Sequence, residues 1–448
     1  MPDSPNLLTL LSELPEQRQQ RPFAWRDGKP LSHAWLAAQV AAWRRLLSAH
    51  AGLRFALYSS DAAAFACILL GAWQAGKTVY LPGDVLPATC ASLGTLVDGY
   101  LGDFPPQCAP LTDAALTAAE AGGARPAFQA LQPDFPGLVI YTSGSTGEPQ
   151  AVPKFLSQLA AEVATLELLF GGRMGNADVV ATVSHQHIYG LLFKVLWPLA
   201  AGRAMHARQL DYLEEFQPQP GAKPVVLVSS PAHLKRLPAA FSAGQAAAIC
   251  TIFSSGGPLP PEVAAAAGHA LGSVPVEVYG SSETGGVAWR QRRAGTDDSW
   301  QVMPAVAWRV AADDVLEIRS PHLPDAGWHA LADQVQAVDR QHFRLKGRVD
   351  RIVKVEEKRI SLDALERQLT TMAQVADARV LLVDQPESQQ RQRIAAFVVL
   401  SAAGADILAA QGKLALNRLL RDGMAHAVEA IALPRSWRYL DALPVNAQ

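Results

Sequence analysis

The stretch Leu138-Val-Ile-Tyr-Thr-Ser-Gly-Ser-Thr-Gly147 decides the fold class. Its first four residues predict a buried strand over 138–141, and a loop of serine, threonine and glycine follows directly. Glycines let the backbone approach an anion closely, and the hydroxyls can donate to phosphate oxygens. A flexible Ser/Gly linker is the alternative interpretation. The position after a strand favours a phosphate site, since open α/β sheets bind ligands at the carboxyl ends of their strands.

Downstream of this loop, strands and helices alternate along the chain. We expect strands over 179–183, 225–228, 249–253 and 276–278, with helices over 189–199, 231–237 and 260–271 between them. This β-α-β-α rhythm is typical of a doubly wound α/β sheet. Upstream, helices over 36–47 and 62–73 alternate with short strands over 54–58 and 78–81, and 102–136 is a connection rich in Pro, Ala and Gly.

The C-terminal third follows a different pattern. Short strands and hairpins are expected from 302 to 352, followed by a small α+β unit with helices over 362–372 and 407–424. We therefore predict an α/β protein with a large N-terminal domain of doubly wound sheets, 1–349, which includes a small β-subdomain. A mobile, smaller α+β domain, 350–448, completes the chain.

The composition is that of a globular enzyme. The chain has 448 residues with 49% hydrophobic content, enough for two domains that each bury a core. Lys and Arg total 39 against 41 Asp and Glu, so charge gives no case for binding nucleic acid or an anionic membrane. The four cysteines fit neither a metal site nor a disulfide framework, and the longest apolar run is too short to span a bilayer. We expect a cytoplasmic protein without a signal peptide.

The segment from Gly71 to Thr78 matches the P-loop pattern GxxxxGK[ST] letter for letter. A P-loop needs a strand before the glycines and a helix after them, so that backbone N–H groups face the phosphates. Here an apolar helix precedes and a β-branched strand follows. We therefore interpret Gly76 as the end of a helix, with Lys77 near the negative end of its dipole.

Three more loops with chemical potential follow predicted strands. In Ser184-His-Gln-His-Ile-Tyr-Gly190 two histidines suggest a metal pair, but no third ligand is near in sequence. In Ser254-Ser-Gly-Gly257 bare glycines allow a flat ring to approach the backbone, although an ordinary strand-to-helix turn is the alternative. In Tyr279-Gly-Ser-Ser-Glu-Thr284 a lone carboxylate among hydroxyls is a plausible Mg²⁺ ligand.

Taken together, these loops resemble the acyl-adenylate-forming ligase superfamily, which includes acyl- and aryl-CoA ligases, nonribosomal adenylation domains and luciferases. Its phosphate signature resembles Tyr141–Gly147 followed by Pro149, and the later motifs stand in family order. Gly327-Trp-His-Ala-Leu-Ala-Asp333 and Gly347-Arg-Val-Asp-Arg351 complete the set. The resemblance spans about 138 to 366 by motif.

The resemblance implies a role for each matching residue. The expected catalytic residues are His187, Glu283 and Arg348, with Glu283 as the metal ligand and Asp350 as the hinge between domains. The expected acid pocket is lined by His187, Tyr189, Gly190, Ser255 and Gly256. The expected ATP/AMP ligands are Thr142, Ser143, Gly144, Ser145, Thr146, Gly147, Gly256, Gly257, Tyr279, Gly280, Ser282, Thr284, Asp333 and Arg348.

The resemblance also implies the reaction. A carboxylate attacks the α-phosphate of ATP in the presence of Mg²⁺ to give acyl-AMP and pyrophosphate, and the thiol of CoA or of a carrier-protein phosphopantetheine then displaces AMP. The residues near the acid pocket, with no long apolar tunnel in the sequence, favour an aryl or short-chain acid. A long-chain fatty acid ligase is one alternative. A non-catalytic adenylate-binding protein is another, against which Glu283, Asp333 and Arg348 argue.

Four departures from the family pattern affect these expectations. Gln150 stands where a lysine is expected, with Lys154 four residues on, and Leu331-Ala332 replaces Thr-Gly before Asp333. Glu357 replaces a glycine near the entry path of the thiol, from which we hypothesise a carrier-protein acceptor in preference to free CoA. The sequence stops before the family's C-terminal lysine. We expect a truncated chain whose adenylation is slower by roughly 10²–10³-fold.

Overall fold

The computed structural model describes residues 6–116, 127–143, 149–218, 223–237, 241–292, 298–355, 358–383, 393–425 and 433–443. The chain divides into two compact units. The first comprises 1–307 with 319–327, and the second comprises 308–318 with 328–447. Among the described residues no helix combines the length and the apolar character that crossing a membrane requires.

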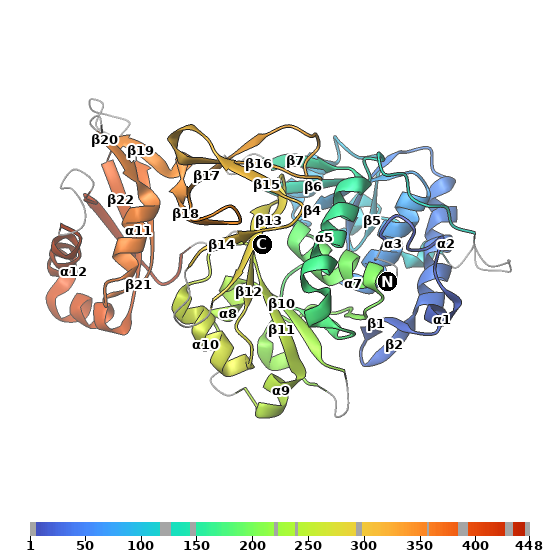
Figure 1. The fold of residues 1–448 in the computed structure, drawn as a ribbon, viewed down its shortest axis with the longest axis horizontal. Helices are drawn as coiled ribbons and strands as arrows, with labels where there is room; N and C mark the ends of the chain where they lie inside the picture. The colour runs from blue at the N-terminus through green and yellow to red at the C-terminus, as the bar shows by residue number, and fades with distance from the viewer. Residues whose placement is uncertain are drawn as a thin grey trace. The chain divides into compact units, whose positions relative to one another are not determined.

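The first unit contains a sheet in which four neighbouring strands are parallel and the last is antiparallel (Figure 1). Its strand order is β5 (Gly99–Gly102), β3 (Arg54–Tyr58), β4 (Thr78–Pro82), β6 (Leu138–Ser143) and β7 (Pro149–Lys154). The strand predicted over 138–141 is therefore present, paired on its other side with β7. Two prolines obscured β7 in the sequence, and they are tolerated because β7 lies at the sheet edge.

A second run of strands in this unit is parallel from β12 to β1 and antiparallel at both ends. Its order is β14 (Trp300–Val302), β13 (Gly285–Gln291), β12 (Val276–Ser281), β11 (Ile249–Ser254), β10 (Val225–Ser229), β8 (Asp178–Ala181), β9 (Met205–His206), β1 (Pro22–Arg26) and β2 (Lys29–Ser32). Every residue of β8 and β10 is buried, as expected for parallel strands covered on both faces.

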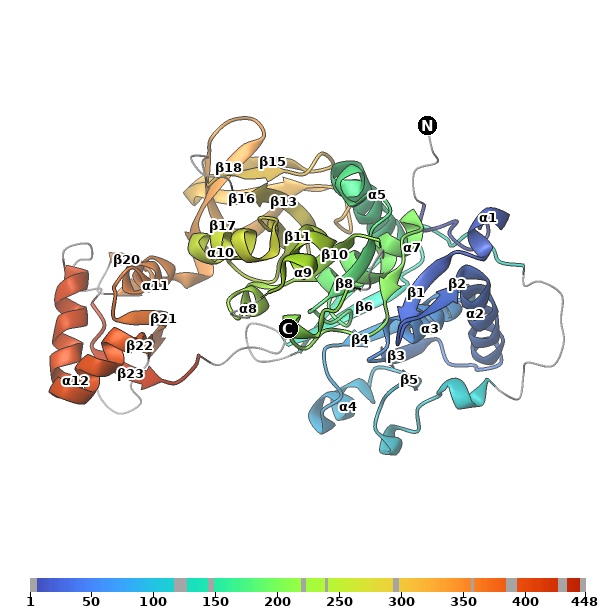
Figure 2. The same ribbon diagram turned by 90° about the horizontal axis from the view of Figure 1, so that it is seen from below.

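Helix α3 (Ala62–Gln74) contacts strands of both sheets, β3, β4 and β5 of one and β9 of the other. It lies beside α2 (His33–Ser48) in Figures 1 and 2. All residues from Phe65 to Trp73 are buried, which explains why this helix is apolar on every side. The Asp61 carboxylate begins the helix by accepting the Ala64 N–H at 2.8 Å.

The remaining helices of the first unit are mostly short. They are α1 (Glu16–Gln19), α4 (Pro87–Leu93), α5 (Leu156–Met174), α6 (Ile188–Gly190), α7 (Trp197–Ala201), α8 (Pro231–Leu234), α9 (Ala243–Ala248) and α10 (Pro261–Leu271). The helix predicted over 189–199 is continuous but changes type, since a π-helical segment, Leu191–Leu196, joins α6 to α7.

The second unit holds a strand run in the order β15 (Ala307–Val310), β16 (Val315–Arg319), β17 (His329–Ala337) and β18 (His342–Arg348), and a hairpin of β19 (Ile352–Val355) and β20 (Lys358–Ser361). Its C-terminal sheet has the order β21 (Val375–Val383), β22 (Arg393–Leu400) and β23 (Ser436–Leu440), accompanied by α11 (Leu362–Thr370) and α12 (Ala402–Ala425). Leu365, Val380, Val398, Leu416 and Trp437 belong to one hydrophobic core there.

The predicted fold class is confirmed. The boundary between the two units differs from the expected one between 349 and 350, because 308–318 and 328–349 belong to the second unit. Strand β18 contacts α11 within the second unit, and the Arg348 N–H donates to Asp363 at 3.3 Å. These contacts group β18 with the C-terminal residues. The hinge at Asp350 stays a prediction.

The P-loop look-alike has the topology of a helix followed by a strand. Helix α3 ends at Gln74, Gly76 adopts a left-handed backbone with φ of +69°, and β4 begins at Thr78. The Lys77 ammonium donates to the carbonyl oxygens of His50 and Gly52, both at 2.7 Å. The Lys77 ammonium therefore binds the chain just after α2, while its backbone N–H donates to the Ala72 carbonyl oxygen of α3 at 2.9 Å.

Replacement of Lys77 by methionine tests this structural role. We expect the free energy of unfolding to fall by about 1–3 kcal/mol, because two backbone carbonyls lose a charged donor. Denaturant unfolding measures the loss. The affinity for ATP, measured by calorimetry on the folded variant, should stay within about twofold of the parent value. A folded Lys77→Met protein that no longer bound ATP would restore the P-loop interpretation.

Candidate active site

Three of the predicted motifs meet at one edge of the first unit. Strands β8, β10, β11 and β12 are parallel neighbours, so their carboxyl ends share that edge. The segments 184–190, 254–257 and 279–284 follow or end β8, β11 and β12, respectively. Segments separated by almost a hundred residues in sequence are thus brought together by strand pairing.

The two histidines of the first motif have different environments. His185 is buried, its Nε2 contacts the Ser59 carbonyl oxygen at 2.9 Å, and its ring lies 4.7 Å from that of Phe65. Burial, with the nearby charge of Lys194, lowers the pKa of His185 to about 3 although the Ser59 contact opposes this shift. His185 is therefore a neutral core residue, and the described residues contain no group of three or more potential metal ligands.

His187 lies instead beside the loop that follows β4. A Cβ placed on Gly83 would come within 2.9 Å of the His187 Cε1, so the absence of a side chain there makes room for the imidazole. Burial lowers the pKa of His187, and the carboxylate of Asp84 opposes that shift. His187 is thus half-buried, and its burial favours the neutral imidazole. Its predicted place in the acid pocket stays a prediction.

Behind Tyr189 an aromatic cluster fills the interior. The Tyr189 and Phe193 ring centroids are 4.8 Å apart, and Phe193 lies 5.0 Å from Phe253 and 5.6 Å from Trp197. Phe170 joins the cluster at 5.2 Å from Phe253. Gly190 is required by close packing, since a Cβ there would stand 2.1 Å from the Ser184 carbonyl oxygen. The segment 184–190 is therefore backed by bulky, rigid side chains.

The segment 254–257 offers exposed backbone. The Ser255 hydroxyl donates to the Val278 carbonyl oxygen at 2.8 Å and so ties the end of β11 to β12. Gly256 has φ of +86°, and nothing lies within 4 Å of a Cβ built on Gly257. Both glycines are exposed, which leaves a flat stretch of backbone open to a ligand.

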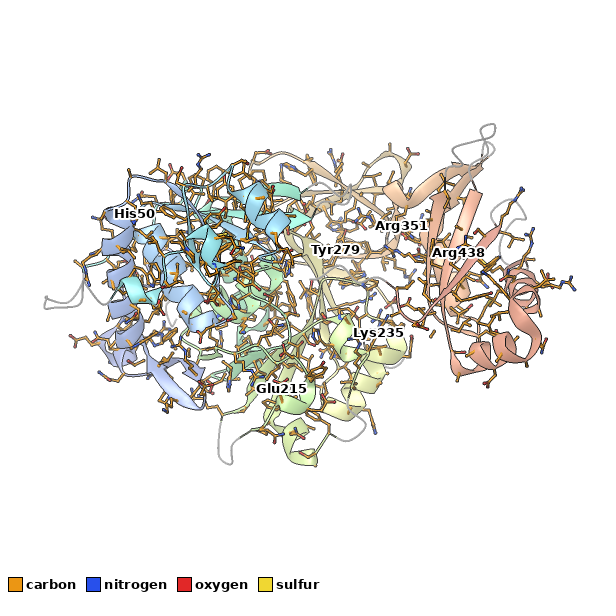
Figure 3. The ribbon with its side chains drawn as sticks, turned by 180° about the vertical axis from the view of Figure 1, so that it is seen from behind. His50, Glu215, Lys235, Tyr279, Arg351 and Arg438 are labelled. Atoms are coloured by element: carbon orange, nitrogen blue, oxygen red, sulfur yellow. The ribbon has the colours of Figure 1, made fainter. Side chains whose placement is uncertain are left out.

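Residues 279–284 form a turn that presents its acidic side chain outward. Tyr279, labelled in Figure 3, lies at the end of β12 with its ring 5.6 Å from that of Trp300. The Thr284 hydroxyl accepts the Ser281 N–H at 3.0 Å and donates to the Gly285 carbonyl oxygen at 2.9 Å. The Thr284 hydroxyl thus closes the turn, and its predicted contact with a phosphate stays a prediction.

Glycine permits the turn at Gly280. A Cβ on this residue would lie 2.2 Å from the carbonyl oxygen of Gly285, the first residue of the next strand. Ser282 is half-buried and Glu283 is exposed. The turn therefore exposes the Glu283 carboxylate to solvent, at the same sheet edge where the other two motifs lie.

A buried polar network lies on the inner side of this turn, and sequence reasoning missed it. Its members are Lys154 at the end of β7, Gln158, Glu162 and Thr165 on α5, and His322. All five are at most 5% exposed. The available signal was the polar spacing 158, 162 and 165 on an otherwise apolar helix face, which marks a row of side chains pointing the same way.

In the second unit the structure places Asp333 and Arg348 opposite each other. They are cross-strand partners in the antiparallel ladder of β17 and β18, although the motifs that contain them are separate in sequence. Asp333 is half-buried and Arg348 is exposed. Arg351 (Figure 3) forms ion pairs with Asp363, at 2.6 Å, and with Glu366 of α11. The residue that follows the predicted hinge is thus held to α11.

Several predicted site residues lie outside the described part of the chain. These are Gly144, Ser145, Thr146, Gly147 and Glu357, together with the side chains of Thr142, Ser143, Gln150 and Asp350. Their roles in phosphate binding, acceptor choice and hinge motion stay predictions.

A family model described as "AMP-binding enzyme" matches residues 95–322. The chain is 29% identical over 319 residues to a 4-coumarate–CoA ligase of Rhodobacter capsulatus, covering 69% of this chain and 73% of that protein. It is 23% identical over 320 residues to a 4-chlorobenzoate–CoA ligase of Arthrobacter, covering 62% and 59% of the two chains. Among solved structures, a benzoate CoA ligase from Burkholderia xenovorans is similar in fold, with a TM-score of 0.78, 18% identity and coverage of 99% and 97%.

The buried neutral state of His185 predicts a pH effect on stability. The unfolded chain binds a proton on this residue below about pH 6.5, whereas the folded chain does so only near pH 3. The unfolded state therefore binds more protons in this window, and stability is lost as the pH falls through it. His185→Gln, which keeps a donor for Ser59, should reduce the slope of unfolding free energy against pH by up to about 1.4 kcal/mol per unit.

Urea unfolding at several pH values between about 4 and 7 measures that slope. His269→Gln is a matched control, because His269 is an exposed histidine on α10 of the same unit. Equal slopes in the parent and the His185 variant would contradict the assignment of a neutral core histidine.

Proposed function

Because the chain belongs to the family of AMP-binding enzymes and is an AMP-forming acid–thiol ligase, we propose that it activates an aryl carboxylic acid with ATP and Mg²⁺. The carboxylate attacks the α-phosphorus of ATP, and pyrophosphate leaves. A phosphopantetheine thiol then attacks the acyl carbon of the acyl-AMP, and AMP leaves. Positioning and charge neutralisation carry such a reaction, since no side chain has to form a covalent bond.

The observation that carries the proposal is the meeting of three motif segments at the carboxyl edge of β8, β11 and β12. In this proposal the Tyr279 ring and the bare backbone at Gly256 and Gly257 accommodate the adenine. The half-buried, neutral His187 orients the carboxylate of the acid. Asp333 binds the ribose hydroxyls, and Arg348 binds the ribose or the phosphate.

The environment of Glu283 fits Mg²⁺ well. The side chain is exposed, and the described residues hold no group of three or more His, Cys, Asp or Glu that would make a dedicated metal cage. Mg²⁺ binds through one or two carboxylates completed by phosphate oxygens and water. When bound, it neutralises charge on the phosphates. The protein contributes to Mg²⁺ binding by holding the Glu283 carboxylate in one position.

The aromatic cluster behind Tyr189 supports an aryl acid. A long alkyl tail that continued inward from Tyr189 would meet Phe193, Trp197 and Phe253, which are at most 3% exposed and whose rings pack within 6 Å of each other. A planar ring needs only a slot against Tyr189. The names of the relatives, 4-coumarate–CoA and 4-chlorobenzoate–CoA ligase, agree with this preference.

The acceptor proposed is a phosphopantetheine thiol, which CoA and carrier proteins share. The relatives are named as CoA ligases, which favours CoA. The opposing argument for a carrier protein rests on Glu357, outside the described residues. Both acceptors and ATP are cytoplasmic, and the described cysteines are all free thiols, so we propose the cytoplasm as the site of action.

Binding of stable adenylate analogues tests the acid preference without requiring turnover. A benzoyl or coumaroyl sulfamoyl-adenylate should bind at least about tenfold more tightly than the palmitoyl analogue, because the aromatic cluster leaves no room for the tail. Calorimetry measures both affinities. A preference for the palmitoyl analogue would point to fatty acid activation, and an absence of binding by either would argue for a protein without ligase activity.

Replacement of Glu283 by glutamine tests the metal ligand. ATP–pyrophosphate exchange driven by an aryl acid should slow by roughly 10²-fold, because one fixed charge that stabilises the transition state is lost. Glu262→Gln, at an exposed glutamate of α10, is the matched control and should exchange at the parent rate. Exchange at an unchanged rate in Glu283→Gln would remove Glu283 from the mechanism.

A further inference from the structure

The buried network behind the turn 279–286 contacts the backbone of the turn. The Lys154 ammonium donates to the Glu283 carbonyl oxygen at 3.0 Å, although Lys154 precedes Glu283 by 129 residues. It also donates to the His322 carbonyl oxygen at 3.4 Å. The backbone carbonyl of Glu283 therefore points inward to Lys154, which is only 1% exposed. The side chain of Glu283 is exposed to solvent.

The next residues of the turn are held from the same side. The Glu162 carboxylate accepts the Gly286 N–H at 3.0 Å, and the His322 Nδ1 contacts the Gly286 carbonyl oxygen at 3.0 Å. A Cβ on Gly285 would lie 2.7 Å from the Glu162 carboxyl carbon, so the carboxylate packs directly on a glycine with φ of +66°. Three backbone atoms near Gly285, one in Glu283 and two in Gly286, are thus held by buried polar side chains.

The network brings one lysine and one glutamate of opposite charge into the interior. Burial lowers the pKa of Lys154, and the carboxylates of Glu162 and Glu283 oppose that shift. A buried ammonium is tolerated when carbonyl oxygens and an opposite charge replace its water. A side chain needed only to fill this space could be apolar, as a methionine of similar length would be. The choice of a lysine at this cost indicates that its hydrogen bonds matter to the turn.

We propose that Lys154 is a positioning residue for the Mg²⁺ ligand Glu283: its ammonium, together with the Glu162 carboxylate on Gly286, fixes the backbone of the turn so that the exposed carboxylate keeps one orientation. This inference rests on the proposed function. It also assigns a role to Lys154, the lysine four residues after Gln150. Lys154 contacts the turn from inside the first unit.

Lys154→Met removes the donor and keeps the length of the side chain. Calorimetric titration with α,β-methylene-ATP, with and without Mg²⁺, measures how far the metal strengthens nucleotide binding. We expect this enhancement to fall roughly tenfold in the variant, as for the loss of one charge-assisted hydrogen bond. Binding of an aryl sulfamoyl-adenylate, which needs no metal, should change less than about threefold.

Two further variants separate positioning from stability. Lys154→Met combined with Glu162→Gln removes the carboxylate charge that the single variant leaves buried, so it should regain thermal stability without regaining the Mg²⁺ enhancement. Lys77→Met is the matched control, because Lys77 is also a buried lysine bound to two backbone carbonyls and has no contact with the turn. It should keep the full enhancement. The proposal would be overturned if the Mg²⁺ enhancement of nucleotide binding rose and fell with thermal stability across the three variants.

Amide hydrogen exchange of the ligand-free protein gives an independent measurement. Peptides covering 281–287 should exchange faster by about tenfold in Lys154→Met than in the parent, while peptides of α3 keep their rates. This result does not depend on nucleotide. If the parent bound no adenylate, the proposed function would fail and exchange would still decide the role of Lys154. Unchanged exchange over 281–287 in the folded variant would overturn it.

Discussion

The parallel pairing of β8, β10, β11 and β12 is the constraint on which the candidate site depends. Parallel strands need crossover connections, and each crossover here begins at the same edge of the sheet. The loop at that edge is the part of each crossover that is free to carry polar groups, because β8 and β10 are buried along their whole length. Strand pairing thereby brings together motifs that are spread over a hundred residues of sequence.

The segment that follows β8 shows how one short stretch serves core and site at once. His185 faces inward to Ser59 and Phe65, whereas His187, two residues on, lies beside Gly83. A turn at His185 and Gln186, just before α6 begins, separates the directions of the two side chains. Burial makes His185 structural in spite of its chemistry. A histidine pair in sequence is therefore weak evidence for a metal site unless both rings face the same way.

The turn after β12 combines an exposed charge with a buried anchor. An exposed carboxylate on a flexible turn would sample many orientations, and ordering it when a ligand binds would cost entropy. Here the ordering is built into the fold, because Lys154, Glu162 and His322 hold the backbone from beneath. The desolvation of two charged groups is the cost, and it is offset in part by hydrogen bonds to backbone groups that would otherwise lack a partner.

Much of the fold could be predicted from sequence, because the strands of the parallel sheet are short apolar runs bounded by glycine and serine. Two of the elements that were missed lie at sheet edges, where β7 contains two prolines and β2 is the last strand of its run. Helix α5, and β9 between β8 and β1, were missed as well. The motif loops were found because glycines and hydroxyls stand out after strands. Lys154 was noted only as a displaced charge, and Glu162 and His322 were not noted at all. Periodicity predicts which side chains share one face of a helix, but not which residues that face contacts. In addition, the partner of Lys154 is a backbone carbonyl, which any residue at position 283 would supply. The network becomes visible only when the topology has brought β7, α5 and the turn together. Its residues therefore have to be found by asking where buried polar atoms find their partners.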